Sequence, residues 1–379
     1  MAHSHARARA LAAAVFFTIA ASSFSAATAP DSSFRCFDSI VSFGDSLSDT
    51  GNDLFPGLHQ GPCLAANPPY GRTYFHRPTG RLSDGRLVVD FIAQSIGLPL
   101  LKPYFSEAHQ KAAQRRRSFS TGVNFAAAGS AVLPYEFYEK IGYQNPWATD
   151  GRKYLEKCLV VLGPLGGNDY NHLFLQGMTL DKVQLVAPLV VTRIGSTIQE
   201  LIKLGAATIL VPGSLPDGCM PISLTIHEKS STPNDYDPQN GCLRWMNQFC
   251  RHHNHLLQEE LQRIRELHPH VNIMYADYYN ATMRMHLSPN QFGFGSQILR
   301  SCCGGGGTYN YDPDKRCGTP QAKCCRDPAE YISWDGVHFM EAANGLIAQG
   351  LLQGLYTDPP FSTICLINST AKPRAIAEY

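Results

Sequence analysis

Short apolar runs alternate with helical patterns along most of this 379-residue chain. The run at Cys158–Leu165 is apolar throughout, which is typical of a strand buried on both faces. Other short strands are predicted at Ile40–Phe43, Gly122–Phe125, Ala207–Val211 and Met274–Ala276, and helices at Leu87–Ile96, Gln184–Leu204, Trp245–Leu267 and Glu341–Leu355. This alternation, with no evident linker or internal repeat, predicts an α/β protein in which helices flank a parallel sheet.

Several of these strands run into turns that carry polar or small residues. Ser46 follows the first strand, Gly129 follows the second, and Asn168 follows the third. Ligands of parallel sheets bind beyond the carboxyl ends of the strands, so these turns are expected to meet at one edge. Each residue taken singly is most often an ordinary turn residue or helix cap. Their shared position favours a functional site.

A serine nucleophile needs a base, a group that orients the base, and donors for an oxyanion. Asp335 and His338 can supply the first two: on a helical turn both side chains project to one side, and the second imidazole nitrogen then faces Ser46. The candidate donors are the backbone N–H groups of Ser46 and Gly129 and the side-chain amide of Asn168. A solvated Asp–His pair is the alternative interpretation.

The tetrapeptide Gly44-Asp45-Ser46-Leu47 resembles the opening block of the GDSL esterases and lipases, also called SGNH hydrolases. The longer Ser42–Asn52 is similar to the version found in the plant branch of that family. Later segments follow in the family's order, at Val123–Ser130, Gly166–Asp169 and Asp335–His338. The resemblance runs from about Phe37 to Leu355.

This resemblance implies roles for the residues singled out above. Ser46 would be the nucleophile, His338 the base and Asp335 its partner, and Ser46, Gly129 and Asn168 would form the oxyanion hole. Gly122 lies in the same block as Gly129 and is the other glycine candidate. The implied fold is a three-layer α/β/α sandwich of flavodoxin-like type. The G-x-S-x-G elbow of the α/β-hydrolase fold does not occur in this chain.

The N-terminus has the composition of a secretory signal peptide. Arg7 and Arg9 precede a short apolar core at Ala10–Ala21, and small residues follow, so cleavage is expected near Ala27. An uncleaved Golgi anchor is the alternative. The predicted organisation is therefore a signal peptide at 1–27 and one hydrolase domain at 28–379.

Twelve cysteines remain after this cleavage, and an even number in an oxidising compartment predicts several disulfides. The adjacent pairs at 302/303 and 324/325 lack the C-x₂-C spacing of a zinc site, so disulfides are favoured there, with undetermined connectivity. Asn280 and Asn368 each begin an N-x-T sequon and are predicted glycosylation sites. The histidines at 252, 253 and 255 crowd one helix, but only those at 252 and 255 share a face, so a solvated face is favoured and no metal and no cofactor is expected.

These features predict a secreted carboxylic-ester hydrolase, residing in the apoplast or cell wall, that forms an acyl-serine intermediate. Short-acyl esters, such as acetylated wall glycans or specialised metabolites, are the expected substrates. The alternatives are an acyltransferase with the same triad, a long-chain lipase, and a non-catalytic glycan- or lipid-binding protein. A net charge of +1 offers no electrostatic argument for nucleic acid or acidic membranes, so no nucleic-acid partner is expected. A monomer with no integral membrane span after cleavage is expected.

Overall fold

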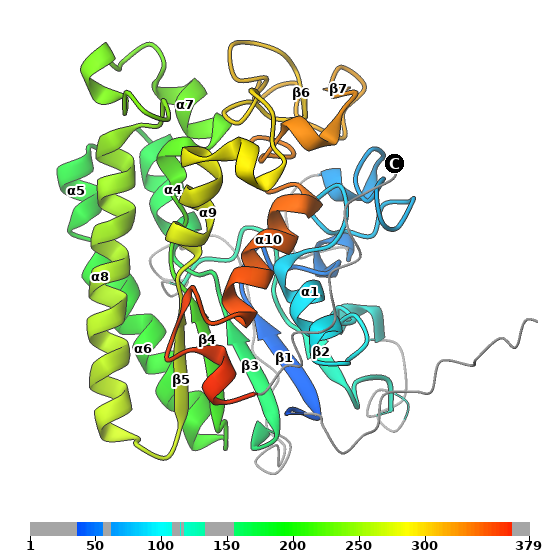
Figure 1. Ribbon diagram of the computed structural model, residues 1–379, viewed down its shortest axis with the longest axis vertical. Coiled ribbons are helices and arrows are strands. Elements are labelled where there is room, and N and C mark those ends of the chain that lie inside the picture. The colour runs from blue at the N-terminus through cyan, green and yellow to red at the C-terminus, as the bar shows by residue number, and fades with distance from the viewer. Residues whose placement is uncertain (1–35, 56–61, 108–113, 115–116, 133–154, 366–379) are drawn as a thin grey trace, which may run out of the picture. The chain divides into compact units, whose positions relative to one another are not determined.

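The computed structural model describes residues 36–55, 62–107, 114, 117–132 and 155–365 (Figure 1). The predicted signal peptide at 1–27 and the sequon at Asn368 lie outside the described residues. The prediction of one domain over 28–379 also includes residues that are not described, and it stays a prediction. The described residues belong to one compact unit.

A six-stranded sheet forms the centre of this unit, in the order β2-β1-β3-β4-β5-β8 (Figure 1). The strands are β1 Ser39–Phe43, β2 Gly122–Asn124, β3 Cys158–Leu162, β4 Thr208–Pro212, β5 Asn272–Ala276 and β8 Thr357–Asp358. The first five strands in this order pair in parallel, and β8 pairs antiparallel with β5. The predicted parallel sheet is confirmed, with an antiparallel edge added.

Helices cover both faces of the sheet because successive side chains of each buried strand point to opposite sides. Leu159 and Val161 of β3 belong to the apolar cluster shared with α1 and α10, whereas Val160 and Leu162 belong to the cluster shared with α6 and α8. The helices are α1 Val88–Ser95, α4 Gly167–Leu175, α5 Leu180–Gln184, α6 Ala187–Lys203, α7 Pro221–His227, α8 Arg244–Leu267, α9 Tyr278–Leu287 and α10 Glu341–Leu352. The α/β/α layering is as predicted.

One helical stretch, Leu180–Lys203, is long and apolar enough by composition to cross a membrane. It comprises α5 and α6, and α6 carries a row of buried residues at helical spacing that includes Val190, Ile194 and Ile198. These residues pack on the sheet as part of the core shared with α8. A core helix of a soluble protein passes the same compositional test.

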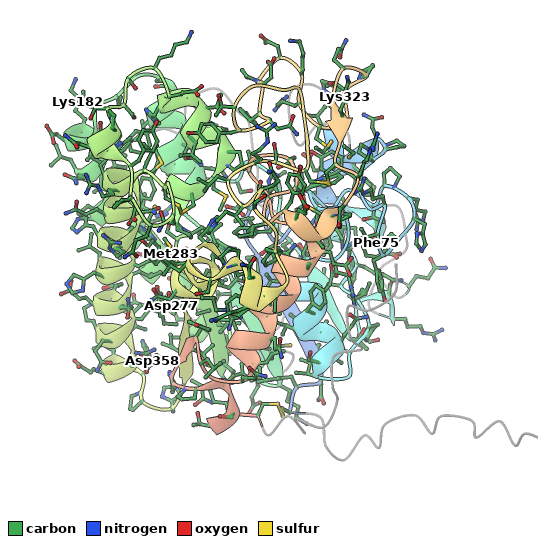
Figure 2. All side chains as sticks on the ribbon, turned by 45° about the horizontal axis from the view of Figure 1, so that its top comes forward. Phe75, Lys182, Asp277, Met283, Lys323 and Asp358 are labelled. Atoms are coloured by element: carbon green, nitrogen blue, oxygen red, sulfur yellow. A yellow bond between two sulfur atoms is a disulfide. The ribbon has the colours of Figure 1, made fainter. Side chains whose placement is uncertain are left out.

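Eight cysteines form four disulfides, which confirms that disulfides are present and settles their pairing. The bonds join Cys36 to Cys365, Cys219 to Cys242, Cys302 to Cys325 and Cys303 to Cys317. Two of them therefore close the cysteine-rich segment, in which β6 Cys303–Gly304 pairs with β7 Lys323–Cys324. Figure 2 shows Lys323 at the outer end of this segment.

Candidate active site

The turn after β1 presents Ser46 at the carboxyl edge of the sheet. The Asp45 carbonyl accepts the N–H groups of Ser48 and Asp49, and its carboxylate accepts the Leu47 N–H at 2.9 Å. This closes a tight turn around Ser46. The turn also lies directly against the one that follows β3, because the Ser48 hydroxyl donates to the Gly163 carbonyl at 2.8 Å.

Glycine at position 44 is required by this close approach of two turns. A Cβ atom on Gly44 would lie 2.8 Å from the Gly163 carbonyl oxygen and 3.1 Å from Cβ of Ser48. Contacts below 3 Å force a shift of the backbone, which here carries the serine. The first residue of the Gly-Asp-Ser-Leu motif therefore has a steric explanation.

Ser46, His338 and Asp335 form one hydrogen-bonded chain, although 289 residues separate Ser46 from Asp335 in sequence. His338 Nε2 lies 2.8 Å from Ser46 Oγ, and His338 Nδ1 lies 2.8 Å from Asp335 Oδ2. The aspartate and histidine are both buried, and the serine is half-buried. The imidazole is thus held between a carboxylate and a hydroxyl.

The expectation that Asp335 and His338 lie on a helical turn is wrong. They lie at the tip of an irregular loop whose arms meet where Ser333 bridges to Phe339. The Asp335 carboxylate accepts the backbone N–H groups of Val337 and His338 at 3.0 and 2.9 Å, and these bonds fold the loop back on itself. Side-chain-to-backbone bonds, rather than helical geometry, bring the two side chains together.

A cavity of about 60 Å³ opens beside the serine hydroxyl. Its lining includes Ser46, Leu165, Asn168, Ser214, Asp217 and Met220. One N–H of the Asn168 amide is directed to the Ser130 carbonyl at 2.9 Å, which leaves its second N–H for a ligand. The Ser46 N–H has no acceptor among the described residues. Two of the predicted donors therefore border the cavity.

Gly129 is not among the residues that line this cavity. It is exposed, with φ of 78°, and its N–H has no acceptor among the described residues. A Cβ atom there would meet nothing within 4 Å. The alternative, Gly122, lies in β2, where a Cβ would be 2.3 Å from the Ile40 carbonyl oxygen. Gly122 therefore has a packing role, and Gly129 stays the glycine candidate.

Three polar residues with no role assigned from sequence tie the serine turn to the glycine block. The Asp49 carboxylate accepts the N–H of Ala128 at 3.1 Å as well as N–H groups of its own turn. Asn52 Nδ2 donates to the Asn124 carbonyl at 2.9 Å, and Asn124 Nδ2 donates to the Ser48 carbonyl at 2.6 Å. The only sequence signals for such a role are the Asp-x-x-Asn spacing of Asp49 and Asn52 just after the serine and the place of Asn124 at the end of β2, in the glycine block.

Carboxylates dominate the electrostatics of the site. Burial raises the pKa of Asp45 to about 6, against hydrogen bonds and the attraction of His338. Burial, reinforced by repulsion from Asp45, raises the pKa of Asp217 to about 7. Burial would also raise the pKa of Asp335, but His338 and the backbone donors hold it below its ordinary value. Asp335 is therefore the carboxyl suited to stay ionised beside an imidazole.

Asp217→Asn is expected to stabilise the protein at pH 8 but not at pH 4. The folded protein retains the Asp217 proton up to about pH 7, whereas an unfolded chain releases it near pH 4. This carboxyl therefore lowers the free energy of unfolding as the pH rises from about 4 to about 7. The variant should gain about 2–4 kcal/mol in free energy of unfolding at pH 8, measured by urea titration. Asp314→Asn, at an exposed position, is the matched control. Equal gains at both pH values would contradict the prediction.

A parallel sheet that carries a serine, a histidine and an aspartate in hydrogen-bond contact at its carboxyl edge, beside a cavity, defines the class of serine hydrolases. Comparison with known proteins identifies the family. The family model described as GDSL-like Lipase/Acylhydrolase matches residues 40–351. The chain belongs to this family and is a carboxylic-ester hydrolase.

Relatives of this chain include proteins from two plants. A GDSL esterase/lipase of Arabidopsis thaliana is 43% identical over 91% of this chain and 91% of its own length. The sinapine esterase of Brassica napus is 41% identical over 88% of this chain and 90% of its own length. Among solved structures, a mutant of an acetyl-xylooligosaccharide esterase from Geobacillus has a TM-score of 0.39 and 13% identity, over 83% of this chain and 93% of the other.

Proposed function

We propose that this esterase is a secreted hydrolase that acts through an acyl-Ser46 intermediate on esters with short acyl groups. The observation that carries the chemistry is the unbroken chain from Ser46 Oγ through His338 to Asp335, with contacts of 2.8 Å at both ends of the imidazole. The four disulfides support folding in an oxidising compartment. Glycosylation at Asn280, which is exposed, and at Asn368 belongs to the same proposal.

In the first half of the proposed reaction, His338 Nε2 takes the Ser46 proton as Oγ attacks the ester carbonyl carbon. The negative charge on the carbonyl oxygen is stabilised by N–H donors of Ser46, Asn168 and Gly129. The C–O bond to the alcohol then breaks, and His338 returns the proton to the departing oxygen. Asp335 holds the imidazole and stabilises its charged form throughout.

In the second half, a water molecule takes the place of the alcohol. His338 removes a proton from that water while its oxygen attacks the acyl carbon. The bond to Ser46 Oγ breaks as His338 returns the proton to the serine, and the carboxylic acid leaves. An acyltransferase would use an alcohol as the acceptor in this step, so the same residues serve both reactions.

The size of the cavity beside Ser46 supports short acyl groups. One water molecule needs about 10–15 Å³ of such space, so a cavity of about 60 Å³ has room for a group of about four heavy atoms. A separate observation favours longer chains: an apolar hollow of about 260 Å³ is lined by Leu165 together with Phe43, Phe125 and Leu162. Leu165 borders both spaces, so a long chain would have to pass it.

The test is the acyl-length profile of the purified protein with p-nitrophenyl esters from acetate to palmitate. We expect kcat/KM to be highest for acetate and to fall at least tenfold by octanoate, because the longer chain meets Leu165. Leu165→Ala should raise the octanoate rate selectively. A wild-type maximum at long chains would contradict the short-acyl proposal. If an added alcohol accepts the acyl group, so that a new ester forms in place of the free acid, the protein is an acyltransferase.

A further inference from the structure

Tyr70 makes a buried hydrogen bond to the carboxylate that holds the histidine. It belongs to the Pro/Gly-rich loop before α1, and only 2% of its surface is exposed. Its phenolic oxygen donates to Asp335 Oδ2 at 2.8 Å. This is the oxygen that His338 Nδ1 approaches at 2.8 Å. Tyr70 is therefore linked to Ser46 through two intermediate side chains.

The direction of this hydrogen bond follows from the chemistry of the two groups. An ionised carboxylate can only accept, so the phenol must donate. Burial, followed by repulsion from Asp335, raises the pKa of Tyr70 well above its ordinary value, and this keeps its proton in place. With Tyr70, His338 and two backbone N–H groups as donors, both oxygens of Asp335 are saturated.

The Tyr70 ring is fixed by the disulfide-rich segment. It packs edge-on against the buried indole of Trp334, with ring centroids 5.7 Å apart. Both rings belong to a buried cluster with Cys302, Cys303 and Cys317, whose disulfides close that segment. The backbone joins the same unit, because the Cys303 N–H donates to the Trp334 carbonyl at 2.7 Å. The hydroxyl thus approaches Asp335 from a rigid support.

We propose that Tyr70 is a positioning residue of the active site, which fixes Asp335 and disperses its negative charge. This inference rests on the proposed function, since it assigns Tyr70 a part in orienting the proposed base. Without the hydroxyl, Oδ2 would face His338 alone. The carboxylate would then hold the protonated imidazole more firmly and would have more freedom to rotate. Both effects slow a reaction in which His338 must accept a proton and release it.

Tyr70→Phe removes the hydroxyl and keeps the ring that packs on Trp334. We expect kcat for p-nitrophenyl acetate to fall about tenfold, with KM changed less than twofold, because the hydroxyl does not touch the substrate cavity. The acidic limb of the kcat/KM profile should move to higher pH by about half a unit or more, because a more firmly held imidazolium loses its proton later. A merely structural role would not move this limb.

The other titratable and charged groups around Tyr70 and Asp335 stay unchanged in the variant. They are Tyr311 and Arg316 from the disulfide-rich segment, Cys63 near Tyr70, and Asp45 beside the serine. Tyr311 packs its ring against Gly336 in the same loop, and no hydrogen bond from its hydroxyl to Asp335 occurs in the described structure. Tyr311→Phe is therefore the matched control and should keep kcat within twofold.

A double-mutant cycle separates positioning from stability. In an Asp335→Ala background, Tyr70→Phe should change kcat less than twofold, because the hydroxyl acts only through that carboxylate. A tenfold loss in that background, or unchanged kcat and pH profile in Tyr70→Phe alone, would overturn the inference. Wild-type protein that hydrolyses none of the esters would instead overturn the proposed function, so the two failures are distinguishable.

Discussion

Ser46→Ala is expected to lower kcat for p-nitrophenyl acetate by about 10⁴–10⁶-fold. Alanine removes the only oxygen within hydrogen-bond distance of His338 Nε2 in the described structure, so no acyl-enzyme can form. Folding should be unaffected, because the hydroxyl is half-buried and makes no other hydrogen bond to the described residues. The measurement is steady-state hydrolysis, together with labelling by a serine-reactive phosphonate that the variant should not accept.

Ser48→Ala is the matched control for this variant. Ser48 lies in the same turn, but its hydroxyl donates to the Gly163 carbonyl rather than to His338. Its loss should cost about 1 kcal/mol of stability and leave kcat within about tenfold of the wild-type value. Wild-type-like activity in Ser46→Ala, or labelling of that variant by the phosphonate, would contradict the proposed mechanism.

Asp335→Asn is expected to lower kcat by about 10⁴-fold while changing KM little. In this variant the new side-chain amide must turn its oxygen toward the N–H groups of Val337 and His338. The opposite orientation would place its NH₂ group against two other donors. The NH₂ group then faces the Tyr70 hydroxyl and His338 Nδ1, and Nδ1 has to become an acceptor. The imidazole proton moves to Nε2, where it blocks transfer from Ser46.

The variant's effect on proton transfer can be separated from unfolding. Phosphonate labelling of Ser46 should slow in parallel with kcat, while the thermal midpoint falls by only a few degrees, because the amide retains most of the hydrogen bonds. Asp327→Asn is a nearby control, since that carboxylate caps a short helix by accepting the Ala329 N–H. An Asp335→Asn enzyme with kcat within tenfold of wild type would show that His338 does not depend on this carboxylate.

Much of the sheet could be predicted because buried parallel strands are apolar throughout. The predicted strands at Ile40–Phe43 and Ala207–Val211 match β1 and β4 to within a residue or two. The structure adds β8, which is too short for any pattern to reveal it. It also adds α9, whose sequence Tyr278–Leu287 mixes aromatic and polar residues without a clear apolar face.

The candidate triad could be selected from sequence because its residues stand in short motifs of recognisable chemistry. The contacts that hold the triad in place could not be predicted in this way. Tyr70 lies in a loop whose composition indicates only an irregular segment, and it meets Asp335 across 265 residues of chain. The spacing of Asp335 and His338 predicts a helical turn, because spacing alone does not distinguish a helix from a loop closed by side-chain bonds.

The sequence by itself determined most of the succession of strands and helices, the sheet edge where the turns meet, and the residue types available for acyl transfer, because each of these depends on local pattern. Only the tertiary structure decided which cysteines pair, how much space lies beside Ser46, and which carboxyls are raised in pKa and which is lowered. Those properties arise from distances between segments remote in the chain and from exclusion of water, and neither quantity is encoded in any single stretch of residues.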